Sequence, residues 1–306
     1  MNYLITIIGP TAIGKTSLSI VLAQHFGCDI ISCDSRQFYK EMRIGTAVPS
    51  DKELAIVTHH FIENKSIFDN YTVGDFEKET IVKLNELFLK NSIQIMVGGS
   101  GLYVNAILKG IDDFPEIDNS VRIKINADFE QFGIDYLQQK LKKLDLDYYH
   151  KIKVENPQTL QNPQRMKRFV EVCIATGKPY SSFLNQKNNR RNFTPIIIGL
   201  EAKREIMYDR IDQRVDLMIT KGLFAEAEGL FKNKQLNALQ TVGYKELFDF
   251  FESKTSLDFA IQEIKKNTRR FSKRQMTWFK KTEKVLWFDY LTKSDDIINS
   301  IENTIK

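Results

Sequence analysis

A glycine-rich loop near the N-terminus carries residue types that bind phosphate. The loop follows the apolar run 3–8, precedes an apolar helical pattern, and consists of Gly9, Pro10, Thr11, Ala12, Ile13, Gly14, Lys15 and Thr16. In this G-x-x-x-x-G-K-[ST] spacing, backbone N–H groups and the positive end of the next helix face phosphate oxygens. Lys15 adds a mobile cation, and Thr16 adds a hydroxyl for Mg²⁺. The loop therefore predicts a di- or triphosphate ligand, without saying which one or whether ATP competes for it.

One carboxylate stands where a catalytic base would be useful. Asp34 follows the second apolar run, whereas the third run, 93–97, ends in two glycines and lacks a terminal Asp. P-loop kinases and ATPases normally use such an Asp to hold Mg²⁺ or orient a nucleophile. Opposite Lys15, Asp34 could take a proton from a bound nucleophile as general base. A helix N-cap or a loop carboxylate is an equally simple interpretation.

The elements that would position these groups alternate between strand and helix. Strand-like runs occur at 3–8, 29–32, 93–97, 195–200 and 285–288, with helical patterns between most of them. This order predicts an α/β fold with a P-loop NTPase-like parallel sheet flanked by helices. Ligands bind at the carboxyl ends of such strands, so the phosphate loop, Asp34 and Gly98–Gly101 should converge on one pocket.

A helical insertion interrupts the core. Between 114 and 194 the strand pattern gives way to amphipathic segments, including a helix over 163–176 and a polar loop over 187–192. We therefore expect a discontinuous core, 1–113 with 195–306, and an all-helical domain over 114–194.

Composition predicts a globular cytoplasmic protein. The 306 residues are 42% hydrophobic and 27% charged, and no apolar run approaches the roughly 18 residues that span a bilayer. No signal-peptide pattern precedes the first strand, and no membrane partner is expected. The three cysteines lack metal-site spacing and are most simply small buried residues.

Basic residues are concentrated near the C-terminus. The net charge is only +5, but one segment without an intervening acid contains Lys265, Lys266, Arg269, Arg270, Lys273, Arg274, Lys280 and Lys281. Helical spacing would align them as a ridge that could follow a nucleic-acid backbone, although a solvated helix face is equally compatible with it. For Trp278 and Phe279, packing is favoured over base stacking. His59 and His60 are expected to be structural or to form a pocket wall, not to bind metal.

Several sequence blocks occur in the order found in one enzyme family. They are Gly9–Thr16, Asp34–Tyr39, Ile44–Ala47, Gly98–Tyr103, Asn162–Arg168, Thr176–Pro179, Val242–Leu247 and Arg274–Phe279. Together they resemble the tRNA dimethylallyltransferases over nearly the whole chain.

The resemblance implies transfer of a dimethylallyl group from dimethylallyl diphosphate to N6 of adenosine 37 in tRNA, with release of diphosphate. It implies that Asp34 is the general base, that the phosphate loop with Mg²⁺ holds the diphosphate, and that Lys15, Thr16 and Arg214 assist, with Thr16 reaching the metal or diphosphate. A departing diphosphate needs charge stabilisation but no γ-phosphoryl machinery, which agrees with the missing strand-end Asp. A monomer is expected.

The resemblance also implies the contacts to the anticodon stem-loop of tRNA. These are Asp34, Ser35, Arg36 and Gln37, the single residues Ser100 and Arg122, and the helical segment Gln164, Arg165, Met166, Lys167 and Arg168. The helical insertion would grip the RNA while the core carries out the chemistry.

The chain departs from the family pattern at a few positions, and alternative functions remain open. Ser100 stands where Thr is common, Ile13 where Ser is common, and the segment 153–161 is longer than usual. The alternatives are an adenylate isopentenyltransferase acting on free nucleotide, a P-loop kinase or NTPase, and a noncatalytic RNA-binding protein. The helical insertion disfavours the first, the missing strand-end Asp the second, and the intact Asp34 and phosphate loop the third.

Overall fold

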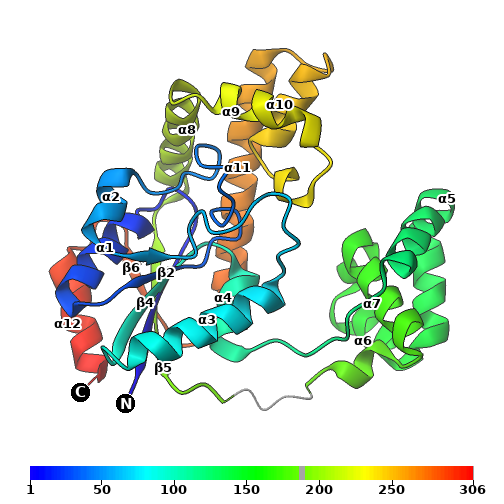
Figure 1. Ribbon diagram of the computed structural model, residues 1–306, viewed down its shortest axis with the longest axis horizontal. Helices are drawn as coiled ribbons and strands as arrows, with labels where there is room; N and C mark the ends of the chain where they lie inside the picture. The colour runs from blue at the N-terminus through cyan, green and yellow to red at the C-terminus, as the bar shows by residue number, and fades with distance from the viewer. Residues whose placement is uncertain (186–189, 306) are drawn as a thin grey trace. The chain divides into compact units, whose positions relative to one another are not determined.

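A parallel sheet forms the centre of the larger part of the molecule (Figure 1). The structure, a computed structural model, describes residues 1–185 and 190–305; the predicted loop over 187–192 therefore lies partly outside the described residues. In the described part the sheet has six strands in the order β3-β2-β4-β1-β5-β6, all parallel. Their bounds are β1 (Tyr3–Ile8), β2 (Ile30–Ser32), β3 (His59–His60), β4 (Ile93–Val97), β5 (Thr194–Glu201) and β6 (Val285–Asp289).

Alternation along the strands supplies two apolar faces. In β1, Ile5 and Ile7 pack on one side, while Leu4 and Ile8 pack on the other. The first face is covered by α1 (Lys15–Phe26), the start of α8 (Arg204–Thr220) and α12 (Ser294–Ile305). The second is covered by α3 (Val73–Phe88), α4 (Gly101–Lys109) and the end of α11 (Leu257–Phe279). Burial on both faces explains why, apart from Thr6, the residues of β1 are apolar or aromatic and do not alternate with polar ones.

A further apolar cluster joins the helices that extend beyond the sheet. It combines α8 and α11 with α9 (Leu223–Leu230) and α10 (Tyr244–Phe251), and its largest fully buried side chain is Tyr244. The short helix α2 (Asp51–Ile56) begins at a Ser50–Glu53 capping box.

Residues 111–190 form a separate compact unit, and 1–110 with 191–306 form the other. The smaller unit contains α5 (Asn119–Leu144), α6 (Leu146–Glu155), α7 (Pro163–Thr176) and the 3₁₀ turns η1 (Pro157–Gln161) and η2 (Tyr180–Phe183), and no strand occurs in its described residues. Its core includes Leu137, Met166 and Val172, all of which are fully buried. The helix α5 contains a non-helical residue, Gly133, at φ 74°.

The predicted fold class is confirmed. Each predicted strand is present within one or two residues, and the helix over 163–176 has the predicted bounds. The two-residue strand β3 was missed because it is too short to show a period. Cys28, Cys33 and Cys173 are buried free thiols, as expected. Among the described residues, no helix combines the length and apolarity needed to cross a bilayer.

Candidate functional site

The phosphate loop turns sharply between β1 and α1. Gly9 has φ 148°, and a Cβ there would lie 2.8 Å from the carbonyl oxygen of Leu200. Gly14 has φ 109° and directly precedes α1. Both positions therefore require glycine, for close approach at the first and for a left-handed backbone at both. The result places the N–H groups at the start of α1 beside a cavity, where an anion is favoured.

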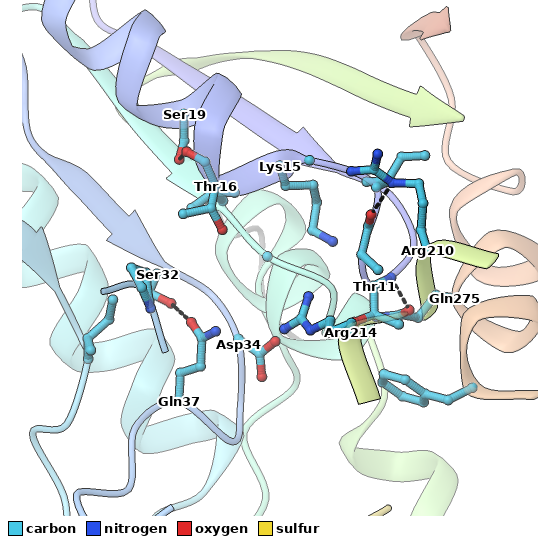
Figure 2. A pocket seen from close by; sticks show the side chains of 18 of the residues that line it. Thr11, Lys15, Thr16, Ser19, Ser32, Asp34, Gln37, Arg210, Arg214 and Gln275 are labelled. Carbon is cyan, nitrogen blue, oxygen red and sulfur yellow. Dashed lines mark hydrogen bonds between the residues drawn. The ribbon is translucent and has the colours of Figure 1, made fainter. Parts of the chain in front are cut away.

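This cavity, the phosphate cavity, has a volume of about 410 Å³ and is lined by the loop residues 11–16. Figure 2 shows Lys15, Asp34 and Arg214 pointing toward one another across it, from α1, the loop after β2, and α8. Thr16 also lines the cavity. The structure thus brings together the four residues for which catalytic roles were predicted; the roles themselves stay predictions.

Two cations share this small space. Lys15 Nζ donates to the carbonyl oxygen of Pro10 at 2.7 Å. Burial, followed by repulsion from Arg214, lowers the pKa of Lys15 to about 7, while Asp34 opposes the shift. Burial also lowers the pKa of Arg214. Because both cations are poorly solvated, a polyanion entering the cavity would relieve their repulsion and restore the charge on Lys15.

Binding of inorganic diphosphate is therefore expected to take up a proton. At about pH 8 the free Lys15 is mostly neutral, and the bound anion raises its pKa, so uptake approaches one proton and affinity falls as pH rises above 7. Isothermal titration calorimetry in two buffers of different ionisation enthalpy measures this uptake. The same measurement on Lys15→Met gives the proton uptake that comes from the diphosphate itself, and this value is subtracted. Equal uptake by both proteins would contradict the prediction.

Asp34 belongs to a second cavity as well. One carboxylate oxygen, Oδ1, accepts the backbone N–H of Arg36 at 3.1 Å, which fixes the side chain in a local turn. The second cavity, the acceptor cavity, has a volume of about 450 Å³ and shares with the first Thr11, Asp34, Arg214, Phe271 and Gln275. Asp34 therefore faces both spaces at their common wall.

The acceptor cavity has mixed walls. Apolar side chains come from α8 and α11, among them Val215, Met218 and Trp278, and polar groups come from Ser35 and Ser100. The two hydroxyls are joined, since Ser100 Oγ donates to Ser35 Oγ at 3.1 Å and also accepts the Ser35 backbone N–H. Apolar faces with a few polar groups suit a flat aromatic ligand such as a nucleobase.

The absence of an acid at the end of β4 has a steric cause. A Cβ at Gly98 would lie 2.1 Å from the backbone oxygen of Cys33, because β4 and β2 close together at this edge. At Gly99, a Cβ would lie 2.3 Å from Nε2 of Gln275. Backbone atoms therefore exclude a side chain at Gly98, and at Gly99 a side chain would displace the amide of Gln275.

Sequence reasoning missed two residues that organise the site. Gln275 in α11 is 6% exposed; it accepts the N–H of Thr11 and donates to the carbonyl of Gly99, both at 2.9 Å. Glu226 in α9 accepts the N–H groups of Ile44 and Gly45 at 2.8 Å and the hydroxyl of Tyr244 at 2.7 Å. Gln275 and Tyr244 belong to sequence blocks that resemble the family, but no local pattern shows their partners.

Two predicted tRNA contacts near Asp34 are engaged within the chain. Arg36 donates to the carbonyl oxygens of Asn237 and Ala238 at 3.0 Å. Gln37 donates to those of Thr46 and Ala47 and accepts from Ser32. Both side chains hold neighbouring loops and also line the cavities, and their contacts to tRNA stay predictions.

Three further predicted RNA contacts, Asp34, Ser35 and Ser100, line the acceptor cavity, and the rest belong to the smaller unit. Gln164 and Arg165 are exposed at the start of α7, and Lys167 and Arg168 are half-buried. Met166 is fully buried in the core of this unit, so its side chain does not reach the surface, and a contact to RNA at this position would involve its backbone or its neighbours. Its position in the helix turns it inward, which the block of polar neighbours concealed. Arg122 is half-buried on α5.

Carboxylates neutralise part of the basic segment. Lys265 pairs with Asp216 at 2.6 Å, Arg269 with Asp212 at 2.7 Å, and Lys280 with Glu201 at 2.6 Å. Lys266 pairs with Glu263 within the helix. Of the two interpretations of this segment, a continuous ridge is interrupted by partners from α8 and β5, while Arg270, Lys273 and Arg274 are exposed on α11.

The aromatic pair at the end of α11 has two different environments. Phe279 is 1% exposed and packs in the core, as expected, but Trp278 is 37% exposed and lines the acceptor cavity. Trp278 also excludes a side chain at Gly101, because a Cβ there would lie 2.3 Å from its ring.

The histidine pair has local partners. His60 Nε2 lies 2.8 Å from Asp29, and His59 Nδ1 lies 2.8 Å from the carbonyl oxygen of Val57, while the His59 ring lines the phosphate cavity. Within residues 1–185 and 190–305, no group of three His, Cys, Asp or Glu residues could hold a metal.

Comparison with known proteins identifies the family. Residues 37–282 match the sequence profile of the IPP transferase family. The chain is 71% identical to a tRNA dimethylallyltransferase of Flavobacterium psychrophilum over 306 residues, which is the full length of both, and 59% identical to that of Christiangramia forsetii over 99% of each chain.

Solved structures agree with this result. A tRNA isopentenylpyrophosphate transferase of Bacillus halodurans matches with a TM-score of 0.72 and 34% identity, over 100% of this chain and 96% of that one. A eukaryotic dimethylallyltransferase acting on tRNA matches with a TM-score of 0.81 and 26% identity, over 100% of this chain and 78% of that one. The predicted resemblance is confirmed: the chain belongs to the IPP transferase family.

Proposed function

We propose that this enzyme transfers a dimethylallyl group from dimethylallyl diphosphate to N6 of adenosine 37 in the anticodon loop of tRNA. A bond forms between N6 and C1 of the dimethylallyl group, the bond from C1 to the diphosphate oxygen breaks, and N6 loses a proton. The observation that carries this proposal is the position of Asp34 in the wall shared by the two cavities. A base there reaches a nucleophile on one side while the leaving group lies on the other.

The phosphate cavity would hold the diphosphate. Backbone N–H groups at the start of α1, Lys15 and Arg214 all surround the space in which negative charge grows on the diphosphate as its bond to C1 breaks. When bound, Mg²⁺ would neutralise part of that charge. The hydroxyl of Thr16 and the diphosphate oxygens are suitable ligands, because Mg²⁺ keeps several waters and needs few protein groups.

The acceptor cavity would hold the adenine. Its apolar walls can cover the ring, and Asp34 can accept the N6 proton. Removing adenosine from the loop costs unstacking energy, which contacts along the rest of the RNA must offset. Exposed Gln164 and Arg165 on α7, with Lys167 and Arg168, supply polar and guanidinium groups for this purpose in the smaller unit. We expect the enzyme to act as a cytoplasmic monomer.

A direct assay tests the proposal. Purified protein is incubated with Mg²⁺, dimethylallyl diphosphate and unmodified tRNA, with AMP in a parallel reaction, and nucleosides are analysed by mass spectrometry. We expect isopentenyladenosine from tRNA alone. Product from AMP alone would reassign the acceptor to free nucleotide. No product from either, together with ATP hydrolysis, would favour an NTPase, and tRNA binding without any turnover would favour a noncatalytic RNA-binding protein.

A further inference from the structure

The side chain of Gln275 bridges two loops at the wall between the cavities. It is the residue of α11 that reaches both the phosphate loop and the segment after β4, through Thr11 and Gly99. The two bonds fix the amide orientation, because Oε1 must accept from an N–H and Nε2 must donate to a carbonyl. The amide is nearly inaccessible, so either backbone group would be left unpaired if it were removed.

The amide of Gln275 fills the space that a side chain at Gly99, just beyond the end of β4, would need. A side chain at Gly99 would collide with Nε2 of Gln275 at 2.3 Å. A neutral amide here adds no negative charge near the diphosphate, and Lys15 Nζ would lie 3.8 Å from that same Cβ. A carboxylate in place of the amide would face the carbonyl of Gly99 without a proton to donate and would attract Lys15 away from the leaving group.

We propose that Gln275 is a positioning residue that holds the phosphate loop in register with the acceptor cavity. This inference rests on the proposed function. Gln275 touches the first half of the loop, at Thr11, whereas in the proposed function the N–H groups at the start of α1 would hold the anion. Losing the bridge therefore affects the alignment of leaving group and acceptor more than it affects diphosphate affinity.

The first test compares Gln275→Met with Gln262→Met, which makes the same change at an exposed position of α11. We expect Gln275→Met to lower kcat at least ~30-fold while the Kd for inorganic diphosphate changes less than ~3-fold. Gln262→Met should retain wild-type values. Gln275→Glu should be no more active than Gln275→Met, despite its similar shape. A loss confined to diphosphate affinity, or wild-type kcat in Gln275→Met, would overturn the proposal.

The second test breaks the bridge from its other end. Gly99→Ala places a methyl group against Nε2 of Gln275, and Gly229→Ala is its control because nothing lies within 4 Å of a Cβ there. The losses from Gly99→Ala and Gln275→Met should not multiply in the double variant, since both remove one bridge. Multiplicative losses would show that the two residues act independently and would overturn the assignment.

A third measurement needs no substrate and separates this inference from the proposed function. The Thr11 amide hydrogen is protected by Gln275, so its exchange rate should rise at least ~10-fold in Gln275→Met. Unchanged exchange would refute the bridge even in an active enzyme. A wild-type protein inactive on tRNA, but with exchange that depends on Gln275, would refute the proposed function and leave the bridge established.

Discussion

Asp34→Asn is expected to lower the single-turnover rate of dimethylallyl transfer to tRNA by about 10²-fold or more, the range typical of a lost general base. The amide keeps the shape of the side chain and can still accept the Arg36 N–H, so the local turn survives. It cannot accept the N6 proton. Rapid-quench measurements with saturating tRNA and dimethylallyl diphosphate isolate this chemical step.

The control for this variant makes the same substitution at Asp29, the residue directly before the first residue of β2. Asp29 precedes the strand and pairs with His60, away from both cavities. Asp29→Asn should therefore react at a rate close to that of the wild type. Affinity for tRNA should also be nearly unchanged in Asp34→Asn. A rate within ~3-fold of wild type would remove Asp34 from the role of base.

Lys15→Met is expected to have the second largest effect, on both diphosphate affinity and turnover. The substitution keeps the length of the side chain but removes a cation whose charged form the diphosphate restores. Loss of a buried charge partner typically costs about 2–5 kcal/mol, which corresponds to roughly 30-fold to several-thousand-fold weaker binding. Titration with inorganic diphosphate measures this loss directly, and an unchanged Kd would refute diphosphate binding by this loop.

Although Lys15→Met should weaken diphosphate binding, it should not lower the stability of the ligand-free protein. A lowered pKa means that the folded state disfavours the charged lysine, so the unfolded chain binds more protons between about pH 7 and 10.5. The destabilisation of the folded state by charged Lys15 is therefore largest below pH 7, and it decreases as pH rises through this window. Lys15→Met should therefore have an unchanged or higher Tm, with the largest gain below pH 7. A Tm that falls at every pH would assign Lys15 a structural role instead.

The parts that were predictable from sequence lie within short contiguous stretches. The phosphate loop, the turn at Asp34 and the strands around them depend on spacing that neighbouring residues set, such as two-residue alternation in β1. The order of elements then limits the topology, because parallel strands bring their carboxyl ends to one edge. The sequence alone therefore sufficed to place Lys15, Asp34 and the segment after β4 together.

The buried side of a helix was harder to assign than its existence. The helix α7 was predicted with the right bounds, yet Met166 was grouped with its polar neighbours as an RNA contact. Its burial follows from the packing of α7 against α5, which the core of the smaller unit shows. In the same way, Trp278 and Phe279 are adjacent, and only the surrounding elements decide that one lines a cavity and the other fills the core.

By itself, the sequence determined the chemistry available to this protein: a phosphate loop, one carboxylate at a strand end, and a helical insertion with basic and polar groups. Only the tertiary structure decided how remote groups complete the site. The bond between Thr11 and Gln275 joins residues 264 positions apart, and the partners of Lys265 and Arg269 come from a different helix. Periodicity shows which face of an element is buried, but the packing of the whole chain determines which atoms contact that face.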